Sequence, residues 1–253
     1  MQEKTLIFYI FDWVLKMTNE KIQNSYVYGL GKGLPIALGY LSVSFGFGIT
    51  AVGMGINPIG TILISLTNLT SAGQMAGIGI IAACGTVIEM ILAQLIINMR
   101  YCLMGLALTQ KLDGSFTTLH RMITSFAITD EVFAVAAAER GLIGRRFMYG
   151  LITLPPVGWT LGTALGAYAG QILPQSVCAA LGLAIYSMFV AIIVPPAKRD
   201  KGVFWAVIIS AAMSCGFYYI PLFDGVTQGF SIIICAVLAS GIMAYIAPKG
   251  VED

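Results

Sequence analysis

Long runs of apolar residues recur along the whole chain, separated by short polar connections. They cover about residues 30–52, 59–83, 86–108, 121–138, 147–170, 176–197, 203–221 and 226–246. Each holds about 20 residues, enough for a helix to cross a hydrocarbon core about 30 Å thick. The runs lack the apolar and polar alternation of β-barrel strands. The pattern therefore predicts an all-α polytopic integral membrane protein, a bundle of about eight transmembrane helices.

Composition agrees with this class. Apolar residues make up 58% of the 253 positions and charged residues only 10%, whereas a soluble domain carries about 25% charged residues. The net charge of +2 is small and the basic residues lie in the connections, which argues against nucleic-acid binding. The five cysteines lie inside apolar runs without metal-site spacing, so we expect buried thiols and no cofactor or metal ion.

The chain divides into a cytoplasmic or interfacial leader, residues 1–28, and a transmembrane transport domain, residues 29–248. The leader contains a short apolar stretch, Thr5 to Phe11, but Asp12 follows it and no small-residue cleavage site is present, which argues against a signal peptide. Two interpretations stay open: an interfacial helix, or a translation start at Met17.

Orientation follows from the basic connections. Eight crossings place the basic residues of the front, of 140–146, of 198–201 and of Lys249 on one side, which the positive-inside rule makes cytoplasmic. The connection with Lys111, His120 and Arg121 then falls on the opposite side. A re-entrant second or fourth segment, leaving seven crossings, is the alternative that would explain this exception. We expect the simple count of eight.

Polar residues at membrane depth carry the functional information, because a charge at the bilayer centre costs about 2.5 to 3.5 kcal/mol. The middle of the second run is rich in small polar residues: Ser65, Thr67, Asn68, Thr70, Ser71, Gly73 and Gln74. This composition fits either a locally unwound or water-lined helix or a helix packed on its neighbours through small residues.

The third and fourth runs carry charges. Glu89 and Arg100 are 11 residues apart and share one helix face, while Gln94 and Asn98 share nearly the opposite face. The fourth run contains Thr129, Asp130 and Glu131 near its middle. We expect an ion pair between Arg100 and Asp130, with a purely structural salt bridge as the alternative interpretation.

These three clusters could surround one point at the membrane midplane, with apolar walls from Phe45, Phe47, Phe126 and Phe133. Donors, one cation and carboxylates beside apolar walls suit a zwitterion with an apolar side chain. The predicted substrate-binding residues are Asn68, Ser71, Gly73, Gln74, Asn98, Arg100, Thr129 and Asp130. The candidates for proton coupling are Glu89, Asp130 and Glu131.

The sequence resembles the AzlC-type permeases over residues 29 to 250. The resemblance rests on Gly33-Leu-Pro35 through Phe45-Gly-Phe-Gly48, Ser71-Ala-Gly-Gln74, Asn98-Met-Arg100-Tyr101 with Leu103-Met-Gly105, and Thr129-Asp-Glu131-Val-Phe133. It implies the larger subunit of a two-component exporter of branched-chain amino acids in the bacterial cytoplasmic (inner) membrane, with methionine as a further candidate substrate. It also implies a small hydrophobic partner subunit of the AzlD type.

Three function classes remain in view. A secondary exporter driven by the proton gradient is the leading hypothesis, since the chain has no GxxxxGK[ST] loop for ATP. An intramembrane enzyme has little support, because His120 is the single histidine and no GxSxG motif is present. We therefore expect no enzymatic activity. A channel or scaffold without coupled transport predicts that Asp130→Asn leaves function intact.

Overall fold

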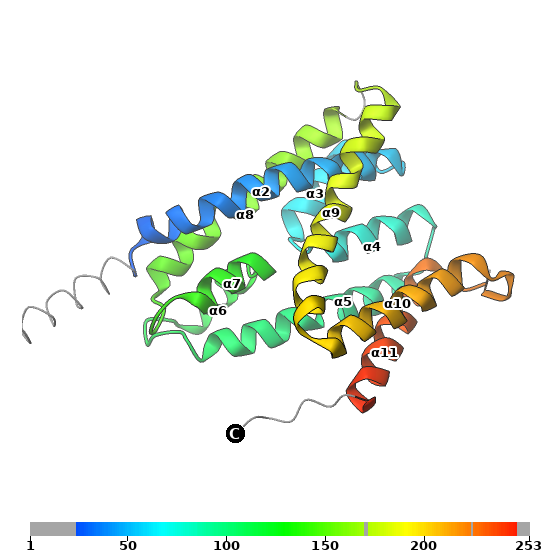
Figure 1. Cartoon of the computed structure of the whole chain (residues 1–253). Coiled ribbons are helices and arrows are strands. Elements are labelled where there is room, and N and C mark those ends of the chain that lie inside the picture. The colour runs from blue at the N-terminus through cyan, green and yellow to red at the C-terminus, as the bar shows by residue number, and fades with distance from the viewer. Residues whose placement is uncertain (1–23, 170–171, 224, 247–253) are drawn as a thin grey trace, which may run out of the picture. The chain divides into compact units, whose positions relative to one another are not determined.

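The computed structural model describes residues 24–169, 172–223 and 225–246 (Figure 1). Within these ranges the regular structure is helical: α2 (Tyr26–Gly53), α3 (Pro58–Thr67), α4 (Ser71–Ala82), α5 (Val87–Thr109), α6 (Thr118–Ser125), α7 (Asp130–Ala138), α8 (Arg145–Ala169), α9 (Gln175–Arg199), α10 (Lys201–Tyr219), the short 3-10 helix η1 (Pro221–Phe223) and α11 (Gln228–Ile246). The predicted all-α membrane class is confirmed. Most of the predicted leader, residues 1–23, lies outside the described residues.

The helices follow the apolar runs and begin at local signals. Asn57 caps α3, where its Oδ1 accepts from Gly60 N at 2.7 Å, and Pro58 occupies the first turn. Four helices in the described part of the chain, α2, α5, α10 and α11, are long and apolar enough to cross a membrane. Helices α8 and α9 have 25 residues each, or about 37 Å.

The second and fourth apolar runs are each broken into two short helices. In the second run α3 ends at Thr67 and α4 starts at Ser71, so the unwound interpretation is the one confirmed. The Gln74 side chain turns back and donates to the carbonyls of Asn68 and, at 3.2 Å, Ile64. In a continuous helix Ile64 and Gln74 would be about 15 Å apart along the axis. The chain therefore bends back on itself at this break.

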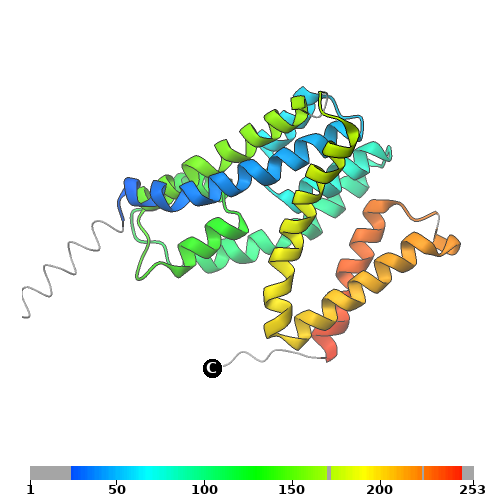
Figure 2. The ribbon, with the colours of Figure 1, turned by 45° about the horizontal axis from the view of Figure 1, so that its top comes forward.

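The chain forms two compact units whose boundaries fall within α2, α5 and α8. The first unit comprises the described parts of Met1–Leu41 together with Arg100–Leu161, and the second those of Ser42–Met99 together with Gly162–Asp253. In the second unit α10 and α11 lie side by side (Figure 2).

Glycines bring the backbones of α2 and α8 into direct contact. In the first unit a Cβ atom on Gly29 would overlap the Phe147 carbonyl oxygen, and one on Gly158 would overlap that of Ala37. In the second unit a Cβ on Gly166 would overlap the Phe45 carbonyl oxygen. Residues further along α2 contact residues further along α8, so the two helices run parallel. The close-packing interpretation of small residues in membrane helices applies to these glycines.

In the first unit the end of α5 lies beside the starts of α2 and α8. Asn24, just before α2, donates from Nδ2 to Leu142 O at 3.3 Å and accepts from Gly144 N at 2.7 Å. Ile143 N donates to Lys111 O at 2.7 Å. Helix α5 therefore runs antiparallel to both. We call this end of the unit, with Lys111, Arg140 and Arg145, the basic end.

The segment α6–α7 starts and finishes at the basic end. It follows α5 after a short connection, and Lys111 Nζ donates to the carbonyl of Glu139, just after α7, at 2.6 Å. In the second unit α5 contacts α11. Its start lies beside the start of α11, because Glu89 Oε1 accepts from Gly229 N at 2.8 Å.

The structure thus differs from eight complete crossings at the two broken segments. In the first unit α6–α7 leaves and rejoins the basic end, so this segment is re-entrant. Because α2 starts and α5 ends at the basic end, we interpret the broken α3–α4 segment as re-entrant too. In the part of the chain that the structure describes, six unbroken helices remain to cross on this interpretation: α2, α5, α8, α9, α10 and α11. With this count Lys111 and Arg121 join Arg140 and Arg145, and alternation brings Lys198–Lys201 to the same side. The basic connection with Lys111 and Arg121 is then no longer an exception to the positive-inside rule. Two re-entrant segments, not one, keep the number of crossings even.

Candidate functional site

Arg100 and Asp130 form the predicted ion pair in the first unit. Arg100 Nη1 lies 2.9 Å from Asp130 Oδ2, and the two side chains are 38% and 28% exposed. Arg100 Nη2 donates to the Tyr101 hydroxyl at 3.2 Å, and its guanidinium lies 5.0 Å from the centre of that ring. Arg100 Nε is buried and has no hydrogen-bond partner among the described residues. The guanidinium thus keeps one N–H group unused.

The carboxylate partner lies at the N-terminus of a half-helix. Thr129 caps α7, where its Oγ1 accepts from Val132 N at 3.3 Å, and Asp130 and Glu131 form the first turn. Negative charges are favourable there because the helix dipole and the free N–H groups point at them. The break before α7 therefore creates a polar position that a continuous apolar helix would not have.

Tyr40 connects α2 to this turn. Its hydroxyl lies 2.6 Å from Thr129 Oγ1 and also contacts the carboxylate of Glu131. The Tyr40 ring is buried and packs edge-on against Trp159, with 5.3 Å between the ring centres. Sequence reasoning missed Tyr40. The available signal was a single hydroxyl-bearing aromatic residue among the small residues of the first apolar run.

In the second unit the predicted residues of the second and third runs meet. Gln94 Nε2 donates to Gly73 O at 2.7 Å, and Asn98 Nδ2 donates to Gln94 Oε1 at 3.1 Å. A Cβ on Gly73 would lie 2.6 Å from Gln94 Oε1, so glycine allows this close approach. Asn98 Oδ1 is buried and accepts no hydrogen bond from the described residues. It is an open acceptor for a bound water or ligand.

Asn68, Ser71 and Gln74 belong to the break between α3 and α4. Asn68 Oδ1 accepts from Thr70 N at 3.2 Å and from Thr70 Oγ1 at 2.9 Å. Gln74 supports the break from the other side through the carbonyls of Asn68 and Ile64. These bonds hold the unwound segment in shape, and Ser71 opens α4 immediately after it.

Glu89 lies apart from these residues. It is 1% exposed, and its Oε1 accepts from Thr227 Oγ1 at 2.5 Å and from Gly229 N at 2.8 Å. Its Oε2 accepts from Thr86 N at 3.4 Å. The carboxylate thus caps the start of α11 and joins it to the start of α5.

Comparison with known proteins places the chain in a family. Residues 35–173 match the model of the AzlC protein family. The chain belongs to the AzlC family. It is 26% identical over 228 residues to the inner membrane protein YgaZ of Escherichia coli, covering 87% of this chain and 91% of that protein. It is 33% identical over 174 residues to an uncharacterized membrane protein of Archaeoglobus fulgidus, covering 67% and 75% respectively. No solved structure matches the chain.

For this AzlC-family chain, the predicted clusters assemble as two groups. The first unit joins Arg100 to Thr129, Asp130 and Glu131, and the second joins Gly73 to Asn98 through Gln94. That all three clusters surround a single point stays a prediction. Phe47, expected as a wall of the site, is fully buried in an apolar cluster with Ala51 and Ile78.

The expectation of buried thiols is wrong for three of the four cysteines whose side chains are described. Cys84, Cys102 and Cys215 are exposed and only Cys235 is buried, and all four are free thiols. Cys102 and Cys215 lie on α5 and α10, and a membrane helix has a lipid-facing side as well as a protein-facing one; Cys84 lies in the turn between α4 and α5.

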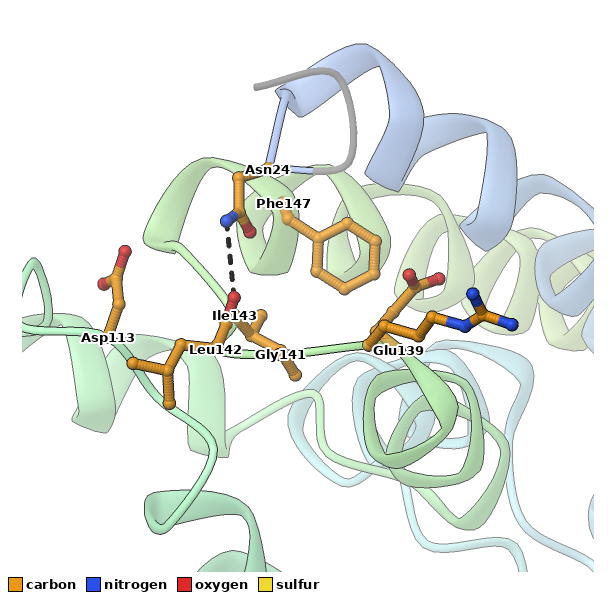
Figure 3. A pocket seen from close by; sticks show the side chains of 8 residues that line it. Asn24, Asp113, Glu139, Gly141, Leu142, Ile143 and Phe147 are labelled. Atoms are coloured by element: carbon orange, nitrogen blue, oxygen red, sulfur yellow. Dashed lines mark hydrogen bonds between the residues drawn. The ribbon is translucent and has the colours of Figure 1, made fainter. Parts of the chain in front are cut away.

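The basic end of this AzlC-family chain contains a cavity of about 340 Å³ (Figure 3). Its lining residues are Asn24, Asp113, Glu139, Arg140, Gly141, Leu142, Ile143 and Phe147. Asn24 bonds to Leu142 O, and Asp113 Oδ1 accepts from Ser115 N at 2.9 Å. These bonds hold the junction of α2, α5 and α8 together.

Proposed function

We propose that this membrane protein of a transporter family is the larger subunit of an exporter of branched-chain amino acids, with leucine, valine, isoleucine and methionine as candidate substrates. The basic end faces the cytoplasm, and in a bacterium the membrane is the inner one. A small hydrophobic subunit of the AzlD type completes the transporter.

The observation that carries the proposal is the unused N–H of Arg100 beside two carboxylates. Arg100 Nε is buried without a partner, while Asp130 lies 2.9 Å from the same guanidinium. A substrate carboxylate is a natural acceptor for this N–H, because charge-assisted hydrogen bonds to guanidinium are among the strongest in proteins. A substrate ammonium finds Asp130 and Glu131 within the same turn. The arrangement fits a zwitterion.

The remaining predicted contacts complete the proposal. Asn68, Ser71, Gly73, Gln74 and Asn98 of the second unit are substrate contacts, with Asn98 Oδ1 as an open acceptor for an ammonium group. Asp130 and Glu131 are the candidates for proton coupling in the first unit. Glu89 is the weaker candidate, since it already caps α11.

Export is tested in cells loaded with dipeptides that release each amino acid internally. Efflux is measured with the chain alone, with the chain plus a small subunit of the AzlD type, and with Arg100→Lys. Lysine keeps the charge but has no counterpart of Nε, so loss of one charge-assisted hydrogen bond lowers efflux about tenfold or more. Arg145→Lys is the matched control, because Arg145 lies at the basic end and contacts His120 Nε2 at 3.1 Å.

Efflux of one amino acid that rises only when both subunits are present supports the proposal and identifies the substrate. Equal efflux from Arg100→Lys and Arg145→Lys would remove Arg100 from the substrate site. No efflux of any of the four amino acids would overturn branched-chain export for this chain.

A further inference from the structure

We propose that Glu131 is the carboxylate that takes up the coupling proton, and that Tyr40 is the residue that positions it. This inference rests on the proposed proton-driven transport and selects one of its three candidate carboxylates. It comes from the way in which the Tyr40 hydroxyl is shared between two oxygen atoms.

The Tyr40 hydroxyl contacts two groups but carries only one hydrogen. Its oxygen lies 2.6 Å from Thr129 Oγ1 and within hydrogen-bond distance of the Glu131 carboxylate. One hydrogen cannot serve both contacts at once. The second hydrogen must come from the Thr129 hydroxyl or from a protonated Glu131.

Both protonation states of Glu131 therefore keep a hydrogen bond between the carboxyl group and Tyr40. When Glu131 is ionised, Tyr40 donates to the carboxylate and Thr129 donates to Tyr40. When Glu131 is protonated, its carboxyl group donates to Tyr40, and Tyr40 donates to Thr129. Uptake of one proton by the carboxylate reverses the two bonds without moving a heavy atom. A desolvated carboxyl group without a partner would cost about 1 to 3 kcal/mol, and Glu131 has Tyr40 as its partner in either state.

The other two carboxylates lack this property. Asp130 is paired with Arg100 at 2.9 Å, so its protonation would leave the guanidinium charge without its partner. Glu89 accepts from the Thr227 hydroxyl and from the backbone N–H groups of Gly229 and Thr86. The two N–H groups can only donate, so protonation of Glu89 would weaken two hydrogen bonds that have no counterpart at Glu131.

The charges around Glu131 favour the same assignment. Arg100 and Tyr101 face this turn from α5, Tyr40 faces it from α2, and Asp130 precedes it on α7. Because Arg100 and Asp130 compensate each other, Glu131 carries the remaining negative charge of the group. Protonation of Glu131 makes the net charge of Arg100, Asp130 and Glu131 zero, which lowers the free-energy cost of placing these residues in the hydrocarbon region during transport.

A matched control lies on the same two elements. At the basic end the Tyr28 hydroxyl donates to Glu139 Oε1 at 3.3 Å, and Tyr28 also belongs to α2. Glu139 follows the last turn of α7 and lies 3.8 Å from Lys32 Nζ. Tyr28→Phe therefore removes a tyrosine–glutamate hydrogen bond of the same chemistry outside the proposed site.

The test begins with proton binding, measured without substrate. Infrared difference spectra of the purified full-length protein are recorded across a pH series, and the C=O band of protonated carboxyl groups is followed. We expect Glu131→Gln to remove one titrating component. Tyr40→Phe moves the C=O band of this component, because the carboxyl group loses its hydrogen bond to the tyrosine hydroxyl. Tyr28→Phe leaves it in place. A component that survives in Glu131→Gln, or that does not move in Tyr40→Phe, would overturn the inference.

Transport is then measured in proteoliposomes containing the same variants and the small subunit. Counterflow at equal pH reports substrate exchange, and uphill uptake under an imposed pH gradient reports coupling. We expect Glu131→Gln to lose the pH-driven uptake by at least about tenfold relative to its own counterflow, and Tyr28→Phe to keep both. Absence of counterflow in the wild-type protein overturns the proposed transport but leaves the titration result standing. Normal pH-driven uptake in Glu131→Gln overturns the coupling role of Glu131.

Discussion

The Arg100–Asp130 ion pair allows a direct test of whether a charged pair at membrane depth serves stability or transport. At 2.9 Å and an effective dielectric constant of about 20, the gross attraction is about 6 kcal/mol. Desolvation offsets most of it, and the exposure of both side chains screens it further. We therefore expect Asp130→Asn or Arg100→Gln alone to lower the free energy of unfolding by about 2 kcal/mol, mainly because one charge is left without its partner.

Removing both charges should have a different result. In the double variant Arg100→Gln/Asp130→Asn no unpaired charge remains, so most of the lost stability returns. In detergent each single variant should lower the midpoint of thermal unfolding by about 5 °C, and the double variant by less than half of that. Amino-acid efflux, in contrast, should be lost in all three variants, because the double variant restores neither the guanidinium nor the carboxylate.

The assay combines thermal unfolding of the purified protein with efflux from dipeptide-loaded cells. Lys32→Gln is the control, because Lys32 and Glu139 form a more distant pair at 3.8 Å and Lys32 is 45% exposed. Such a pair is worth less than about 1 kcal/mol. Recovery of efflux together with stability in the double variant would refute the transport role and leave a structural salt bridge. Failure of the double variant to recover stability would refute the electrostatic reasoning.

Two further predictions concern packing and topology. Gly166→Ala places a Cβ against the Phe45 carbonyl oxygen and should destabilise the protein by about 1 to 3 kcal/mol, whereas Gly39→Ala, with nothing within 4 Å, should not; thermal unfolding of both variants compares them. In a background that keeps only the native Cys84, an impermeant thiol reagent should label that residue from outside the cell. Gly114→Cys without Cys84 should react only from the cytoplasm; labelling of Gly114→Cys from outside would contradict two re-entrant segments.

The sequence was informative where the physical cause was local. Eight apolar runs mark the eight helical segments, because helices that lie in lipid, whether they cross it or re-enter, need long apolar sequences. The polar middle of the second run marked its break, and similar depth along two segments was enough to pair Arg100 with Asp130. These features depend on the residue types of one or two runs.

Features that depend on three-dimensional contacts could not be obtained in this way. The number of complete crossings changed because the fourth run also breaks, between Ser125 and Asp130, although its sequence is apolar enough for a helix. Tyr40 meets Thr129 across 89 positions of the chain, and no local pattern encodes that meeting. Glu89 looked like a coupling carboxylate from its depth alone. In the structure its carboxylate instead accepts a hydrogen bond from the start of α11 and caps that helix.

The glycine contacts between α2 and α8 prevent these two helices from moving relative to each other, while other helices keep that freedom. Where one backbone touches another, no side chain is available to change rotamer and absorb a displacement, so within each unit these two helices must travel as one body. The half-helices α3, α4, α6 and α7 are joined by unwound residues and have no such restriction. A transport cycle in this protein should therefore leave the spacing between α2 and α8 constant in each unit while the half-helices change their tilt.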